Sequence, residues 1–263
     1  MRNTLKILGK LLIIGILTTI VRIVGQMLIP VGIQTVLKPS LFVENGTMPL
    51  AFTIYGIFAY GIIASLFLLV KDKIAGNRVL RGVKFGASCS LIWVVYLLEP
   101  LPHVAFIDKF TYPIADSIAL LVLGALSGLL LCKKDCKEYK SVLSIRFNSV
   151  FAITVAFVIG RIIQYCVIDI YSDFHNNKIE SIIWSIVVGL VLSLILQWLN
   201  TKVTSKNLFY RVIIVGVILF GVDLLLFNFF MPLVFSVDIL DLFVRTFVDL
   251  LFVTIGCFSL EKN

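Results

Sequence analysis

Long uninterrupted apolar runs constrain this chain more than any other feature of its sequence. A membrane-spanning helix needs about 20 mostly apolar residues, and eight windows qualify: 11–29, 50–70, 82–101, 113–132, 149–168, 181–199, 210–230 and 239–259. Strands of a membrane β-barrel would instead alternate in polarity over about ten residues. Only 14% of the 263 residues are charged, against about 25% in a soluble domain. The sequence therefore predicts an all-α, polytopic bundle of about eight transmembrane helices.

The distribution of lysine and arginine predicts how this bundle is oriented. With the N-terminus inside, only Lys38, Lys109 and Lys178 fall in connections on the outer side, and the inner segments hold most of the other basic residues. Because cytoplasmic loops are enriched in lysine and arginine, both termini are expected inside. The net charge of +8 then reflects topology and attraction to anionic membrane lipids. It gives no reason to expect a nucleic acid as a partner.

The first and second halves of the sequence also resemble each other. A shift of 130 residues, with small gaps near the ends, brings matching residues together. The matches are Asn77 with Asn207, Arg81 with Arg211, Gly86 with Gly216, Pro102 with Pro232, Val104 with Val234, Asp108 with Asp238, Arg22 with Arg161, and Asp116 with Asp249. This pattern predicts two four-helix repeats, 1–132 and 147–263, joined by a basic cytoplasmic linker at 133–146. Coincidence among residues that are common at membrane interfaces is the alternative interpretation.

Polar and charged side chains inside the apolar runs are the candidate functional residues, because such residues are costly in a membrane and by default mark functional sites. The predicted substrate-binding set is Arg22, Gln26, Asp116, Arg161, Gln164, Asp223, Arg245 and Asp249. An unpaired arginine at this depth would cost a few kcal/mol or more. We therefore expect ion pairs between Arg22 and Asp116 and between Arg161 and Asp249, with Glu99 as a further candidate partner.

Nearly all of these groups lie in the predicted outer half of the bilayer, which predicts a polar vestibule that opens outward. Its rim would include Tyr96, His103, Tyr112 and Tyr165. Three interpretations stay open: a substrate or proton pathway, ion pairs that only hold helices together, and a surface for a partner. In the last window, Asp241, Arg245 and Asp249 would share one helical face and could neutralise one another.

Several catalytic motifs are missing from the sequence. It contains no H-E-x-x-H zinc motif, no phosphate-binding G-x-x-x-x-G-K-[ST] loop and no G-x-S-x-G nucleophile elbow. We therefore expect no metal and no cofactor, and the sequence leans against an enzyme. The G-x-x-x-G of Gly124 and Gly128 suits close helix packing, either within the bundle or between two copies of the chain.

Together these features predict a small transporter or permease-like protein of the cell membrane. The arginines would hold an anionic or zwitterionic solute, and the aspartates would balance charge or carry protons. A partner subunit, such as a separate ATPase, stays open. The alternative is a non-catalytic accessory, sensor, resistance or immunity protein that binds a lipid, peptide or protein. A third interpretation, an intramembrane enzyme acting on lipid through Glu99 and Asp116, has no recognised pair of nucleophile and base.

Overall fold

The computed structural model describes residues 2–30, 32–133 and 145–260, and over these residues the fold is all-helical. Seven stretches of the described chain are long and apolar enough to cross a membrane: Asn3–Leu28, Met48–Lys73, Arg78–Leu97, Asp108–Leu131, Phe147–Ile168, Lys178–Asn200 and Leu208–Val234. The predicted all-α fold is confirmed, and the seven helices suit a multi-pass membrane protein. The eighth window is also a helix, Ile239–Cys257, but it carries Asp241, Arg245 and Asp249. Its span therefore stays a prediction.

The helices follow one another with short connections. They are α1 (Arg2–Leu28), α2 (Leu41–Glu44), α3 (Met48–Val70), η1 (Lys71–Lys73), α4 (Arg78–Leu97), α5 (Asp108–Leu131), α6 (Phe147–Ile163), η2 (Gln164–Ile168), α7 (Lys178–Asn200), α8 (Leu208–Val212), η3 (Ile213–Gly221), α9 (Val222–Asn228), α10 (Met231–Val234) and α11 (Ile239–Cys257). The elements η2 and η3 are π-helical, and such segments are frequent at functional sites. The predicted linker at 133–146 lies largely outside the described residues.

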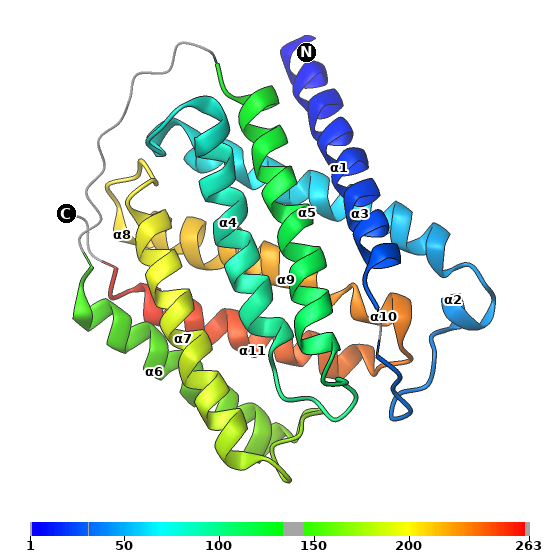
Figure 1. The fold of residues 1–263 in the computed structure, drawn as a ribbon. Helices are drawn as coiled ribbons and strands as arrows, with labels where there is room; N and C mark the ends of the chain where they lie inside the picture. The colour runs from blue at the N-terminus through cyan, green and yellow to red at the C-terminus, as the bar shows by residue number, and fades with distance from the viewer. Residues whose placement is uncertain (1, 31, 134–144, 261–263) are drawn as a thin grey trace.

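Figure 1 shows α1, α5 and α4 side by side in front, with α3, α9 and α11 crossing obliquely behind them. The closest packing joins α4 to α5, where four glycines form two facing G-x-x-x-G patterns. A Cβ placed on Gly82 would lie 1.9 Å from the carbonyl oxygen of Gly124, and one on Gly128 would lie 2.1 Å from that of Arg78. Only glycine permits backbones to approach this closely. The G-x-x-x-G of α5 therefore packs within the bundle.

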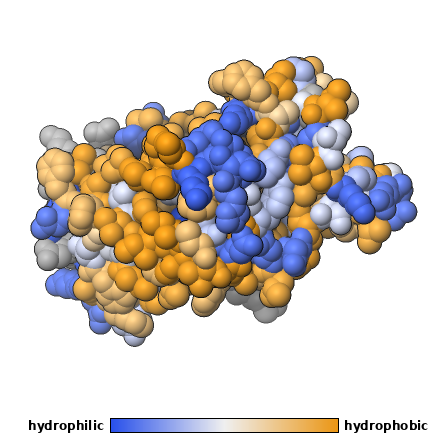
Figure 2. Space-filling model, turned by 90° about the horizontal axis from the view of Figure 1, so that it is seen from below, coloured by the Kyte–Doolittle hydropathy of each residue, from blue (hydrophilic) through white to orange (hydrophobic). Residues whose placement is uncertain are grey.

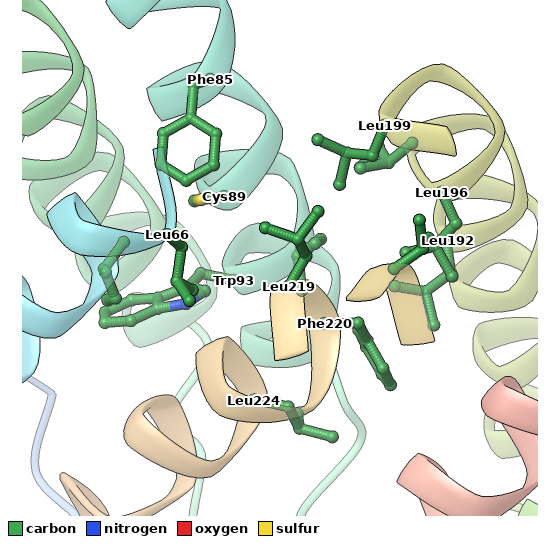
Figure 3. Close-up of a cluster of buried hydrophobic side chains, with 14 of the residues drawn as sticks. Leu66, Phe85, Cys89, Trp93, Leu192, Leu196, Leu199, Leu219, Phe220 and Leu224 are labelled. Carbon is green, nitrogen blue, oxygen red and sulfur yellow. The ribbon is translucent and has the colours of Figure 1, made fainter. Parts of the chain in front are cut away.

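A large apolar cluster fills the space between α4, α7 and η3 (Figure 3). Phe85 and Cys89 of α4 lie on one side of it, and Leu192 and Leu196 of α7 lie on another. Phe220 of η3, which is fully buried, lies between them. Because α4 precedes the linker and the other two elements follow it, this cluster joins the first four long helices to the later ones.

The two sets of helices pack in the same order. In the first set, α1 contacts α3 and α5, and α5 contacts α4; in the second, α6 contacts α7 and α11, and α11 contacts η3 and α9. Asn77 caps α4 by accepting a hydrogen bond from the Leu80 amide, and Asn207 caps α8 by accepting one from the Phe209 amide. Two residues matched by the shift of 130 thus do the same task at the start of the third long helix of each set.

Polar contacts between the first and fourth helices also recur. Gly32, after α1, donates its amide hydrogen to the carboxylate of Asp108 over 2.8 Å. Tyr171, after η2, donates its amide hydrogen to the carboxylate of Asp241 over 3.2 Å. Asp241 thus makes a contact like that of Asp108, whereas the ungapped alignment matches Asp108 with Asp238.

Candidate functional site

The eight predicted site residues lie in three separate places. Arg22, Gln26 and Asp116 form one group between α1 and α5. A second group forms between the end of α6, η2 and α11: Arg161, Gln164, Arg245 and Asp249, together with Glu99 from the connection after α4. Asp223 of α9 stands apart and contacts Trp93 of α4. Both predicted arginine–aspartate pairs are thus present.

The first group is a simple ion pair. The Nε of Arg22 donates to Oδ1 of Asp116, and its Nη1 donates to Oε1 of Gln26 over 2.8 Å. Arg22 and Gln26 are one helical turn apart, so both side chains lie on the face of α1 that meets α5. The guanidinium also lies 5.9 Å from the ring centroid of Phe52 on α3. Both charged side chains are largely buried, with 7% and 9% of their surface exposed.

The second group is a cluster of four charges, two positive and two negative, which we call the four-charge cluster: Glu99, Arg161, Arg245 and Asp249. Arg161 donates to Oε1 of Glu99 over 2.9 Å and to Oδ2 of Asp249 over 2.6 Å. Arg245 donates to Oε2 of Glu99 over 2.8 Å. Glu99 therefore bridges two arginines, and its position in the chain makes it the one member that comes from before the linker.

Three aromatic rings surround Arg161 in addition to its two carboxylates. The guanidinium carbon lies 4.7 Å from the ring centroid of Trp184, 5.3 Å from that of Phe157 and 5.6 Å from that of Tyr96. Cations over aromatic faces gain electrostatic stabilisation, which is larger in a desolvated site. The Arg161 side chain has no exposed surface. In this conformation, water from either side of the membrane does not reach it.

The π-helical segment η2 supplies the uncharged polar groups of the four-charge cluster. Gln164 donates from Nε2 to Oδ1 of Asp249 over 2.7 Å, and the Tyr165 hydroxyl donates to Oε1 of Glu99 over 3.3 Å. Asp169, which follows the segment directly, adopts a left-handed backbone conformation with φ of 58°. A π-helical turn widens the helix, and here it lies where Arg161 and Gln164 both reach Asp249.

Asp223 has a different environment from the other buried carboxylates. It is fully buried, and its Oδ1 accepts a hydrogen bond from the Trp93 indole N–H over 3.2 Å. Its Oδ2 has no hydrogen-bond partner among the described residues. Where Asp116 and Asp249 each meet an arginine, no ion pair joins Asp223 to a described cation.

Of the four residues predicted at the rim of the vestibule, His103 lies in a loop, beside Tyr171 and the four-charge cluster. His103, in the connection between α4 and α5, lies 3.1 Å from the Tyr171 hydroxyl. Arg245 donates a hydrogen bond to the Tyr171 backbone carbonyl. Burial, and next the charge of Arg245, lower the pKa of His103 to about 4. The imidazole is therefore neutral at physiological pH.

Figure 2 views the molecule from below, where the connections between α4 and α5 and between α6 and α7 lie in Figure 1. Hydrophilic residues gather near the middle of this face, with apolar residues around them. The polar face agrees with a rim of polar residues. The charged groups of the four-charge cluster are buried, so the structure does not expose them in the outward-opening vestibule that the sequence suggested.

Sequence reasoning missed the central place of Glu99. It placed Glu99 near the end of the window 82–101 and named it as a candidate partner, but left it out of the substrate-binding set. In the structure Glu99 lies beyond the last turn of α4. The neutralisation of α11 by its own charges is not what the structure shows. Arg245 pairs with Glu99, and Asp241 accepts a hydrogen bond from the Tyr171 amide.

No family model matches this chain, and no curated protein or solved structure matches it either.

Proposed function

We propose that this protein is a small transporter or permease-like protein of the cell membrane that carries a small anionic or zwitterionic solute. In this proposal α11 is the eighth span, both termini lie inside, and the chain is a duplication of two four-helix repeats. Transporters with repeats related by an axis along the membrane normal place their substrate site at the interface between the repeats. Alternating access then comes from rocking one repeat against the other.

The recurring contacts support the duplication. The pairs Arg22–Asp116 and Arg161–Asp249 join the first and fourth helices of each set. Tyr55 on α3 donates its hydroxyl to the Leu226 carbonyl over 2.8 Å, and Trp184 on α7 donates its indole N–H to the Val95 carbonyl over 2.7 Å. The second helix of each set thus reaches the third helix of the other. Reciprocal contacts of this kind are expected of two repeats related by a two-fold axis.

The observation that carries the transport proposal is the bridge from Glu99 to Arg161 and Arg245. Burying two ion pairs costs several kcal/mol of desolvation per ion, and apolar residues of similar size are often at least as stabilising. Stability alone therefore does not explain four charges here. Two arginines that share one carboxylate can instead donate hydrogen bonds to the carboxylate or phosphate of a solute that replaces it. Arg161 Nε and Gln164 Oε1, buried and without a described partner, add a donor and an acceptor beside them.

The proposal predicts that the four-charge cluster opens to the outside. The test replaces the native cysteines and introduces a single cysteine at Gln164, with Leu192→Cys in the apolar cluster as a matched buried control. Both native side chains have no exposed surface. A membrane-impermeant maleimide is applied from outside, and labelling is followed by mass spectrometry with and without Glu99→Gln.

We expect slow labelling at Gln164→Cys and several-fold faster labelling when Glu99→Gln removes one charge that holds the outer side closed. Leu192→Cys should stay unlabelled in both backgrounds, which also shows that the variants remain folded. Labelling at Gln26→Cys, Ala115→Cys and Phe252→Cys then maps how far the opening extends. If Gln164→Cys resists the reagent in both backgrounds, the charges are permanently dry, and the accessory, sensor or immunity protein becomes the better proposal.

A further inference from the structure

Asp223 is a buried carboxylate that lies outside the proposed solute site and has no role in it. Of the other carboxylates buried within the long helices, Asp116 pairs with Arg22 and Asp249 with Arg161. Asp108, in the first turn of α5, accepts hydrogen bonds from the Gly32 amide and the Thr111 hydroxyl. Asp223 is 0% exposed and has one hydrogen bond, from the Trp93 indole. Its second oxygen lacks a partner among the described residues. A buried carboxylate with so little support is expected to give up its charge.

The position of Asp223 links it to both sets of helices. Trp93 and Asp223 are 130 residues apart, which is the shift that aligns Asn77 with Asn207 and Gly86 with Gly216. Matching positions on the third helix of each set therefore contact one another. In two repeats related by a two-fold axis, a residue that touches its own counterpart lies at that axis. The π-helical segment η3 ends directly before α9, which places irregular backbone next to Asp223.

The groups around Asp223 determine which ion it can bind. On α4, its neighbours are the Trp93 indole and the Cys89 thiol. On α3, the Tyr60 ring stacks against Trp93, and Tyr55 bonds the Leu226 carbonyl. A metal cation such as Ca²⁺ or Mg²⁺ needs about six or more oxygen ligands, and an indole N–H and a thiol do not supply them.

The helix α11 also packs against α9. Two of its charged groups are in ion pairs, and its Asp241 accepts a hydrogen bond from the Tyr171 amide. Arg245 is paired with Glu99, and Arg161 is paired with Asp249. Neither arginine therefore neutralises Asp223. The Asn228 side chain on α9 donates to the Thr246 hydroxyl of α11 over 2.7 Å, which leaves the contact between these helices uncharged. Of the simple cations, a proton alone needs no further ligand.

We propose that Asp223 is a proton-binding site at the boundary between the two sets of helices. In the closed conformation the carboxyl is the neutral acid, with Oδ1 accepting from Trp93 and the proton on Oδ2. When the boundary opens to water, the O–H bond breaks, the proton passes to water, and the carboxylate is left hydrated. Reprotonation from the other side would couple solute movement to a proton gradient; this coupling rests on the proposed transport function, and the proton site itself does not.

Infrared difference spectroscopy of the purified protein in lipid tests the site directly. The wild type at neutral pH should show the C=O stretch of a protonated carboxyl, and Asp223→Asn should lose this band. Asp249→Asn is the matched control and should keep the band, because Asp249 is ion-paired. A wild-type spectrum with no protonated carboxyl assignable to Asp223 at neutral pH would overturn the proposal.

Thermal stability gives a second readout. Asn is isosteric with the neutral acid and still accepts from Trp93, so Asp223→Asn should change Tm by less than about 2 °C. Asp249→Asn leaves a buried arginine short of a partner and should lower Tm by roughly 10 °C. Equal losses in the two variants would mean that Asp223 is charged, against the proposal. If the infrared band of a protonated carboxyl is present but Gln164→Cys is never labelled, the proton site stands and the transport proposal is refuted. If Gln164→Cys is labelled but the band is absent, the transport proposal stands and the proton site is refuted.

Discussion

The arginine–aspartate pair between α1 and α5 and the one between α6 and α11 differ in what they gather around them. Arg22 and Asp116 stay within one set of helices, with Gln26 as their polar neighbour. Arg161 and Asp249 add Arg245 from α11 and Glu99 from the other set. The second pair is also fully buried, whereas the first retains some exposed surface.

Two positions account for most of this difference. Counted from the matched aspartates Asp116 and Asp249, the position of Arg245 corresponds to Tyr112 in the first set. Counted by the shift of 130, Glu99 corresponds to Phe229. The pair Arg22–Asp116 therefore has neither a second arginine beside it nor a bridging carboxylate from the other set. An arginine–aspartate pair that would otherwise join two helices of one set thus connects the two sets of helices when two further charges, Glu99 and Arg245, are added.

Replacing the arginine of each pair should have the largest effect on the free energy of unfolding and should distinguish the two pairs most clearly. Arg161→Met leaves Glu99 and Asp249 short of a cation, whereas Arg22→Met strands Asp116 alone. Breaking a buried pair costs about 3–5 kcal/mol, so we expect Arg161→Met to cost about 5 kcal/mol or more and Arg22→Met about 3 kcal/mol. Denaturant unfolding in mixed micelles, followed by tryptophan fluorescence, measures both free energies of unfolding.

Double variants separate lost charge balance from lost packing. Asp249→Asn should restore much of the stability of Arg161→Met, because Glu99 and Arg245 remain as a neutral pair. Asp116→Asn should do the same for Arg22→Met. If Arg161→Met is no more damaging than Arg22→Met, the four charges do not act as one cluster and the contrast between the two pairs is wrong.

Glycine substitutions should sharpen the comparison with a smaller effect. A Cβ on Gly82 would meet the Gly124 carbonyl oxygen at 1.9 Å, which is backbone and cannot move aside locally. A Cβ on Gly216 would meet the Thr254 hydroxyl at 2.9 Å and the Thr254 Cα at 3.2 Å, which requires a much smaller shift of the neighbouring helix. Gly82→Ala should therefore cost about 2–3 kcal/mol, and Gly216→Ala about 1 kcal/mol or less. The same unfolding assay measures both, and equal costs would contradict the tighter packing of α4 on α5.

Much of the fold could be predicted because span length and apolar runs are set by the bilayer. The boundaries were less predictable. The third window extended to residue 101, but α4 ends at Leu97, before Pro100; the fourth began at 113, but α5 begins at Asp108 and contains Pro113. Hydropathy measures solvent preference, whereas helix ends depend on caps and on proline.

The candidate site was predictable only in part. The cost of an unpaired arginine pointed to the pairs Arg22–Asp116 and Arg161–Asp249, since few other carboxylates were available at the same depth. The spacing within α11 suggested that Arg245 would pair along its own helix, whereas it reaches Glu99. Periodicity shows which residues share a face but not which helix lies opposite. The 130-residue alignment pairs Trp93 with Asp223 as equivalent positions, but only the structure shows that these two side chains touch.

The smallest expected effect concerns the loops above the two pairs, where acid should distinguish them. Above the first pair, Gly32 binds the Asp108 carboxylate; above the second, His103 meets Tyr171 beside Arg245. Because burial and the Arg245 charge lower the pKa of His103 to about 4, from about 6.5 in the unfolded chain, the unfolded state binds a proton first as pH falls. The contribution of neutral His103 to the free energy of unfolding is therefore complete above about pH 6.5 and is lost toward pH 4. The loss is about 1 kcal/mol at pH 5 in this partly hydrated rim.

Lowering the pH from about 7.5 to 5 should reduce Tm by about 2–4 °C more in the wild type than in His103→Gln, whose amide does not titrate. An equal drop in both proteins would show that protons act elsewhere, and that the loop over the four-charge cluster is no more sensitive to acid than the loop over Arg22 and Asp116.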